Sequence, residues 1–344
     1  SGLDWQALSE ISVGWQWVLV ATLLGIVTRF WFARIWIFFL SKSGAKFSRP
    51  QRLELYEVYA KSWLGRYIPG SVTWVVGKVY FASKLGISKA RLAISSFIEA
   101  VLQIVTVLLS ASLLLLLDPR SSELAGNWIW VILAVAILGL VAVFPPVLRS
   151  YASKAYQLLR QAKLDESLIP SNRTLGSGVL LFVVSSLLSG LALFFVALAV
   201  DPELGLSELM FVLAASNLAS AVSMVAVFAP AGVGVREAIQ IAALLFVMSP
   251  EQAVAATLMM RLLSIVWDGL FLVIANIDFC ALRRRISIVR KALGKVFNFR
   301  HRAREFRAWR HRLEIVERWL CADAIHINTN LSSRKCRKRY ANSS

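Results

Sequence analysis

The stretch FAPAGVGVREAIQIAALLFVMS (residues 228–249) interrupts an apolar run with a Pro/Gly turn and places Arg236 and Glu237 shortly after that turn. A second stretch, IPGSVTWVVGKVYFASKLGIS (residues 68–88), interrupts another apolar run at a Pro-Gly pair and carries Lys78. Proline lacks the N–H that would continue a helix, and glycine tolerates the backbone angles of a tight turn. The interrupted apolar runs extend over residues 53–85 and 207–248, and we therefore expect each run to form two short helices that meet at a turn within a membrane.

Five uninterrupted apolar runs surround these two stretches. Of the 344 residues, 58% are hydrophobic and only 17% are charged, whereas soluble domains are about one quarter charged. A run of about 20 apolar residues matches a transmembrane helix, while a barrel strand needs only about ten alternating residues. The composition therefore predicts an all-α polytopic membrane protein. The runs cover residues 13–40, 90–117, 128–148, 175–200 and 253–277.

The positive charge is concentrated in the tail and in a few loops. The formal net charge is +18, of which residues 276–344 carry +13. Lys and Arg also gather in residues 41–52, 84–91 and 149–173, whereas the segments expected on the other side of the membrane contain one Arg, Arg120, and no Lys. By the positive-inside rule these loops and the tail are cytoplasmic. This accounts for the charge without nucleic acid as a partner.

The two halves of the chain share one pattern. Adding 161 to a residue number takes Pro69 to Pro230, Ser88 to Ser249, and the first apolar run onto the fourth. An odd number of crossings per half would insert the second half upside down, so we predict an inverted repeat, each half with a re-entrant helix pair. The same offset calls for a helix before residue 1. The predicted parts are an extracytoplasmic segment (1–12), a first membrane repeat without its preceding helix (13–126), a second membrane repeat (127–277) and a basic cytoplasmic tail (278–344).

Ionisable residues inside the apolar runs are the candidates for a binding site, because such residues are costly in lipid and are often functional. Glu99 and Gln103 share one face of the second run, and Arg261 and Asp268 share one face of the fifth. The repeat places Glu99 and Arg261 at nearly the same depth, so we expect them to meet, directly or through a substrate head group. A static ion pair that fixes helix packing is the alternative.

The remaining cations and polar groups lie near the two turns. Arg236 follows a turn at a half-helix N-terminus, where N–H groups and the helix dipole favour anions. Lys78 is a second candidate for a lipid phosphate, unless its side chain reaches the cytoplasmic interface instead. The predicted substrate-binding residues are Lys78, Glu99, Gln103, Asn217, Arg236, Glu237, Arg261 and Asp268, and the predicted turn residues are Pro69, Gly70, Pro230, Gly232 and Gly234.

These motifs resemble the flippase-like transmembrane domain of lysylphosphatidylglycerol synthase/flippases. The resemblance covers residues 13–277 and is most specific in PAGVGVREA (residues 230–238) and the later Arg261. It implies a multi-pass protein of a bacterial or archaeal cell membrane that moves a lipid, or an aminoacylated or glycosylated lipid, between leaflets. Where many relatives have a Gly-rich turn with an acidic residue and an Arg, this chain has SVTW at residues 71–74, and it has Ala100 where an Arg commonly follows the Glu.

A transporter of membrane lipids is the function that the pattern favours, since inverted repeats with broken helices are typical of transporters. The alternatives are a transferase acting on a polyprenyl phosphate, with Glu99 or Asp268 as base, and a scaffold that recruits an envelope-lipid enzyme through its tail. The sequence predicts no catalytic residue, no cofactor and no metal ligand, and it leaves a homo-oligomer open.

Overall fold

The computed structural model describes residues 12–68, 73–118, 120, 128–143, 146–147, 170–226 and 232–277. The chain separates into two compact units, one of residues 1–47 with 53–275 and one of residues 48–52 with 276–344. The description that follows concerns the first unit. The predicted turn residues Pro69, Gly70 and Pro230 and the basic tail lie outside the described residues.

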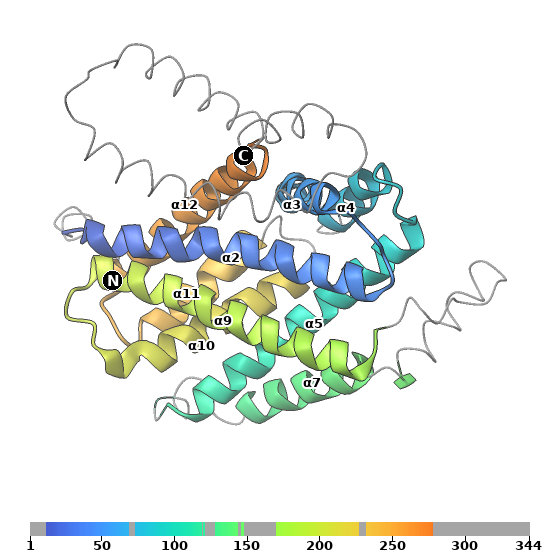
Figure 1. Cartoon of the computed structure of the whole chain (residues 1–344). Coiled ribbons are helices and arrows are strands. Elements are labelled where there is room, and N and C mark those ends of the chain that lie inside the picture. The colour runs from blue at the N-terminus through green and yellow to red at the C-terminus, as the bar shows by residue number, and fades with distance from the viewer. Residues whose placement is uncertain are drawn as a thin grey trace, which may run out of the picture. The chain divides into compact units, whose positions relative to one another are not determined.

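Every regular element in the described part of the chain is a helix, as predicted (Figure 1). The nine α-helices described there are α2 (Trp15–Lys42), α3 (Arg49–Trp63), α4 (Thr73–Ser83), α5 (Lys89–Leu116), α7 (Trp128–Val143), α9 (Asn172–Val200), α10 (Leu209–Val225), α11 (Val235–Leu244) and α12 (Pro250–Ala275). Helix α3 is extended by a 3-10 turn, η1 (Leu64–Tyr67). A second 3-10 turn, η3 (Leu206–Glu208), precedes α10.

Five helical segments are long and apolar enough to cross a membrane. Four of them, α2, α5, α9 and α12, correspond to predicted runs. The predicted run that starts at Trp128 forms α7, whose apolar part is shorter. The fifth segment is Leu206–Val225, which we predicted to be a short arm of a helix pair. Its 20 residues extend about 30 Å, which is long enough to cross a membrane, although we predicted a short helix here.

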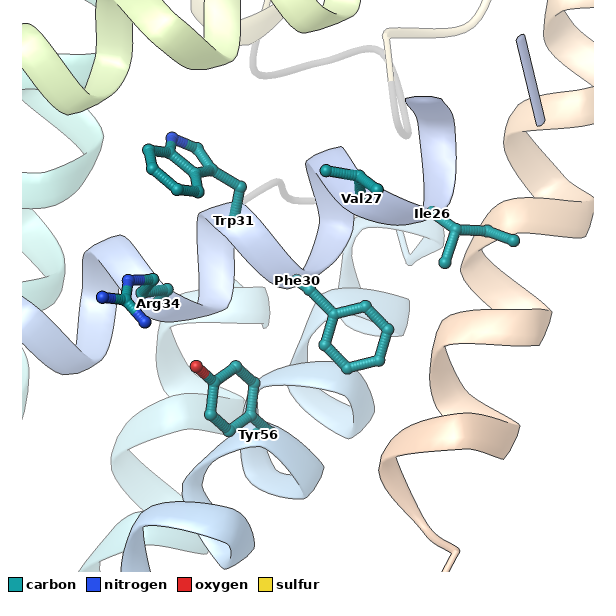
Figure 2. Close-up of a pocket in the computed structure, with 6 residues that line it drawn as sticks. All are labelled: Ile26, Val27, Phe30, Trp31, Arg34 and Tyr56. Atoms are coloured by element: carbon teal, nitrogen blue, oxygen red, sulfur yellow. The ribbon is translucent and has the colours of Figure 1, made fainter. Parts of the chain in front are cut away.

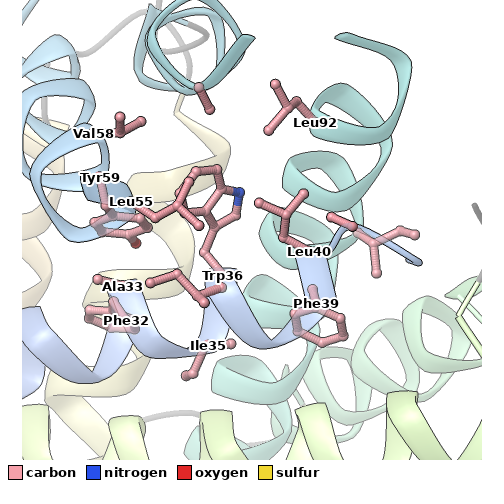
Figure 3. Close-up of a cluster of buried hydrophobic side chains, with 14 of the residues drawn as sticks. Phe32, Ala33, Ile35, Trp36, Phe39, Leu40, Leu55, Val58, Tyr59 and Leu92 are labelled. Atoms are coloured by element: carbon pink, nitrogen blue, oxygen red, sulfur yellow. The ribbon is translucent and has the colours of Figure 1, made fainter. Parts of the chain in front are cut away.

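The helices pack around two large clusters of buried side chains. Helix α2 lies along α9, while α10 packs against both α5 and α9 (Figure 1). The first cluster is aromatic where α2 faces α3: Trp36 and Tyr59 are 5.9 Å apart between ring centroids, and both are at most 1% exposed (Figure 3). Large rings between two helices bury much apolar surface and hold the backbones apart.

Arg120 joins the end of α5 to η3. Its guanidinium donates to the Asp118 carboxylate at 2.9 and 3.1 Å and to the Ser207 carbonyl at 2.9 Å, and it lies 3.6 Å from Glu208. The hydrogen bonds from Arg120 lower the pKa of the Asp118 carboxyl. The one cation of the predicted extracytoplasmic segments is thus neutralised by the protein itself, which reconciles it with the positive-inside rule.

Gly25 allows α2 to approach α12 closely. A Cβ atom at this position would lie 2.1 Å from Cδ2 of Trp267, whose side chain is only 1% exposed. No real Cβ tolerates that distance, so either the indole or the helix would have to move. The contact brings the α2 face that carries Arg29 against the α12 face that carries Asp268.

We expect Gly25→Ala to lower the free energy of unfolding by about 1–3 kcal/mol, the usual cost of overpacking. Gly269→Ala on α12 is the control, because nothing lies within 4 Å of the Cβ that it adds. Thermal unfolding of the purified protein in detergent measures both. Equal melting temperatures for the two variants would contradict the close approach.

Candidate functional site

Asp268 of α12 accepts hydrogen bonds from three different elements. Arg29 Nε of α2 donates to Oδ1 at 2.5 Å, and Trp63 Nε1 of α3 donates to the same oxygen at 3.1 Å. Tyr67 of η1 donates its hydroxyl to Oδ2 at 2.7 Å. Asp268 is 2% exposed and Arg29 is 7% exposed. Because a buried carboxylate is costly unless its oxygens are satisfied, these three donors hold α2, α3 and η1 against α12.

Lys78 of α4 forms a second buried ion pair. Its ammonium donates to Glu99 Oε2 of α5 at 2.5 Å, and Tyr59 donates to Glu99 Oε1 at 3.3 Å. The rings of Tyr59 and Trp74 lie 4.3 and 4.2 Å from Nζ. Lys78 and Glu99 are both 0% exposed. Cation–π attraction adds to the ion pair, so this lysine is neutralised inside the protein and does not reach the interface.

The predicted direct meeting of Glu99 with Arg261 is therefore wrong, whereas a meeting through a substrate head group stays a prediction. Glu99 forms its ion pair with Lys78, and Arg261 lies 3.4 Å from Glu237 of α11. The predicted inward faces of the two helices are confirmed, since Glu99 is fully buried and the Arg261 side chain is 17% exposed. The spacing along a helix does not show which charged residue will pair with Glu99 or Arg261. In each case the partner comes from the short helix that precedes the long one, α4 or α11.

Four arginines, here called the arginine group, gather where these elements meet. They are Arg29 of α2, Arg66 of η1, Arg236 of α11 and Arg261 of α12. Arg236 lies within electrostatic range of the other three and of Glu237. Arg66 covers the ring of Trp63 at 4.9 Å and that of Tyr67 at 5.5 Å, the same two residues that bind Asp268. The group is thereby joined to the Asp268 site.

Among the described residues, the arginine group carries more positive charge than the neighbouring carboxylates balance. Its four guanidinium groups are accompanied by two carboxylates, Asp268 and Glu237, which leaves a formal charge of +2. Arg66, Arg236 and Arg261 are partly exposed. The Nε of Arg236 is buried and has no hydrogen-bond partner within the described ranges. An anion is the ligand that such an arrangement can bind, because guanidinium groups pair with phosphate oxygens through parallel hydrogen bonds.

The turn before α11 positions Arg236. Gly232 and Gly234 have φ angles of 70° and 83°, which favour glycine. A Cβ on Gly232 would also lie 2.6 Å from Cβ of Ser223 on α10. Glu237 accepts the Gly234 N–H at 2.7 Å and so caps the start of α11. Glu237 therefore has a local structural task in addition to its ion pair with Arg261.

The other candidates lie away from these contacts. Gln103 is 6% exposed on the inward face of α5, and Asn217 is 1% exposed on α10 with its Nδ2 atom buried and unpartnered by any described residue. Among the described residues, neither forms a hydrogen bond or an ion pair with the arginine group, although each presents polar atoms to the interior. Within the described ranges, no group of three His, Cys, Asp or Glu residues is suited to hold a metal ion.

Sequence reasoning overlooked five residues that form hydrogen bonds or charge contacts in the site: Arg29, Tyr59, Trp63, Arg66 and Tyr67. Arg29 is the clearest omission, because it lies within an apolar run, as Glu99 and Arg261 do. The same rule that selected those two would have selected it. The two tyrosines, Trp63 and Arg66 carry no comparable signal, since they occur in the more polar part of an interrupted run, before the first turn, and are drawn into the site only by the fold.

An all-helical protein with five potential spanning segments and a charged interior is a polytopic membrane protein. The family model described as the lysylphosphatidylglycerol synthase TM region matches residues 2–271, so the chain belongs to this family, in agreement with the resemblance. Membership indicates a membrane protein of lipid metabolism or of flippase type. No curated protein matches the chain.

We expect Lys78→Met to lower stability by about 3–5 kcal/mol, because it leaves the buried Glu99 carboxylate without its counter-charge. Adding Glu99→Gln should recover part of this loss, so the two changes will not be additive. Lys61→Met is the control, since Lys61 pairs with Glu57 on the exposed surface of α3, where such pairs contribute about 0.3–0.5 kcal/mol. Unfolding of the purified variants in detergent measures both losses. Equal losses for Lys78→Met and Lys61→Met would contradict the buried ion pair.

Proposed function

We propose that this protein is a membrane lipid flippase or transporter, which moves a phospholipid, an aminoacylated lipid or a lipid-linked sugar between leaflets. The observation that carries the proposal is the arginine group, with its net charge of +2 and a buried, unpartnered Nε on Arg236 among the described residues. A phosphate head group supplies the missing negative charge. Family membership is consistent with a lipid as the ligand.

The proposed head-group site, meaning the residues that would contact the lipid phosphate, contains fewer residues than the sequence predicted. Arg236, Arg66 and Arg261 are partly exposed and can meet a phosphate. Lys78 and Glu99 neutralise each other and serve to seat α4 on α5. Asp268 accepts three hydrogen bonds and orients Arg29, so its role is to position the group.

The order and length of the helices support the proposed inverted repeat. Moved by 161 residues, α3, α4 and α5 fall on α10, α11 and α12 to within two residues at every end, and α2 falls on α9 to within four. Ser88 and Ser249 are equivalent, and each accepts a hydrogen bond from a backbone N–H in the first turn of the helix that follows. Each half thus repeats a long helix, a helix pair around a turn, and a capped long helix.

Re-entrant pairs would give this repeat a transport mechanism. In the proposal, α3 with α4 enters from the cytoplasm and α10 with α11 enters from the opposite face. Helices α4 and α11 have 11 and 10 residues, about 15 Å of axis, which is too short to cross a bilayer. The two turns would lie at depth, where alternating access can expose the arginine group to either leaflet. The basic tail would then be cytoplasmic.

The transferase alternative has less support from the geometry. A carboxylate that acts as a general base needs a free oxygen facing a substrate. Asp268 accepts hydrogen bonds on both oxygens, and Glu99 does so while fully buried. Both candidates for the base therefore have structural partners.

The transport proposal predicts that Arg236→Gln slows lipid movement at least tenfold, since a charged hydrogen bond to phosphate contributes about 1.5–3 kcal/mol. Proteoliposomes with fluorescent lipids of varied head group measure the rate. Arg173→Gln, at the exposed start of α9, is the matched control and should leave the rate unchanged. If folded wild-type protein accelerates none of the lipids, or if both variants act alike, the proposal is refuted.

The re-entrant topology predicts which residues share a side of the membrane. In a variant without the native cysteines, Glu203→Cys and Glu251→Cys should react with an impermeant maleimide from one side, and Lys46→Cys and Lys84→Cys from the other. Labelling of Glu203→Cys and Glu251→Cys from opposite sides would show that Leu206–Val225 crosses the bilayer. This outcome would exclude the second re-entrant pair.

A further inference from the structure

A groove runs along α2 beside α3. Its lining consists of Ile26, Val27, Phe30, Trp31 and Arg34 of α2, with Tyr56 of α3, and its volume is about 470 Å³ (Figure 2). We call it the α2–α3 groove. Apolar side chains form most of its length, and the one charged residue, Arg34, lies at one end (Figure 2). The volume falls within the range of about 300–1,000 Å³ that is usual for small-ligand sites.

The walls of the groove are held in place by contacts behind them. Phe30 packs edge-on against Phe271 of α12 at 4.8 Å between ring centroids, and it lies 6.1 Å from Tyr56. The Nε1 of Trp31 donates to the Leu181 carbonyl of α9 at 2.9 Å. Rings anchored in this way cannot close the groove without losing packing or a hydrogen bond. The groove is therefore preformed.

The groove opens on the surface of α2 that lipid would cover. Along this helix an exposed apolar residue recurs at every fourth position, which is the spacing of one helix face. The residues and their exposures are Trp15 at 70%, Leu19 at 67%, Leu23 at 66% and Val27 at 49%. Arg34 follows Val27 by seven residues, two helical turns, and is also exposed. A cation thus continues a stripe that is otherwise apolar.

Arg34 is placed where a charge needs an anionic partner. It precedes Lys42, the last residue of α2, by eight residues, about 12 Å of helix axis. Helix α2 has 28 residues, about 42 Å, against about 30 Å of hydrocarbon. Arg34 therefore lies near the boundary of the hydrocarbon layer, where its guanidinium can reach the head-group phosphates of one leaflet. The described residues offer it no carboxylate within 4 Å.

We propose that the α2–α3 groove binds one anionic phospholipid from the leaflet on the Lys42 side. Its phosphate pairs with Arg34 and the hydroxyl of Tyr56, which points toward the Arg34 end of the groove (Figure 2), and one acyl chain lies along Ile26, Val27 and Phe30. Charge complementarity selects the anionic head group, and the apolar length selects a chain over a free phosphate. The site goes beyond the proposed function, because it holds whether or not the protein transports lipid.

The groove is separate from the head-group site. Arg29 and Arg34 are five residues apart, about 140° around the helix axis, so they point to different sides of α2. Arg29 is 7% exposed and binds Asp268, whereas Arg34 is exposed. A variant of Arg34 can therefore be examined without disturbing the Asp268 contacts.

The experiment measures binding of dioleoylphosphatidylglycerol to the full chain in detergent, by native mass spectrometry and by the shift in melting temperature. Arg34→Gln removes the charge, and Val27→Trp fills the groove without changing the charge. Lys46→Gln removes an exposed cation outside the groove and is the control. We expect at least tenfold weaker binding for Arg34→Gln and for Val27→Trp, and wild-type binding for Lys46→Gln. The zwitterionic phosphatidylcholine and the chain-free glycerophosphoglycerol should bind at least tenfold more weakly than the anionic lipid.

Three results would overturn the site. Wild-type affinity in Arg34→Gln would mean that Arg34 only extends to the interface. Wild-type affinity in Val27→Trp would mean that no chain enters the groove, and an equal loss in Lys46→Gln would mean that any surface cation attracts the lipid. Size-exclusion profiles and helical circular dichroism identify variants that fail to fold, in which case Arg34→Lys and Val27→Phe replace them. A negative result in the transport assay leaves these outcomes unaffected.

Discussion

The hydrogen bonds to Asp268 determine how the charged interior is assembled. One carboxylate receives donors from α2, α3 and η1, and two of these elements, α2 and η1, carry Arg29 and Arg66 of the arginine group. In an interior without water, each donor and acceptor needs a partner within the protein, so the helices can settle only where all three bonds form together. Gly25 makes this possible, because it removes the side chain that would keep α2 away from Trp267.

The two groups of buried charges have opposite consequences. Lys78 and Glu99 balance each other within a cage of aromatic rings, so the pair is complete without a ligand. Among the described residues, the arginine group has a surplus of positive charge and partly exposed members, so under the proposed function an anion completes it. The proposed binding and release of a phosphate requires this second kind of site. The first kind seats the short helix α4 on α5.

Local pattern predicted much of this fold and part of the site. The inward faces of α5 and α12 follow from the spacing of Glu99 and Gln103 and of Arg261 and Asp268, because side chains three or four residues apart share a helix face. The pairing of these residues did not follow. The pairing depends on where α4 and α11 lie along the long helices α5 and α12. The pattern of residues within one helix does not show how a neighbouring helix is positioned along it.

The sequence by itself determined that this chain is helical, spans a membrane and belongs to a family of lipid-related membrane proteins, because long apolar runs and local motifs are properties of neighbouring residues. Only the tertiary structure decided which charges meet. Arg29 and Asp268 are 239 residues apart in the chain, and Arg66 and Arg236 join them from two further elements. Contacts at such separations form when helices pack, and close packing accepts one arrangement of side chains where the sequence pattern permits several.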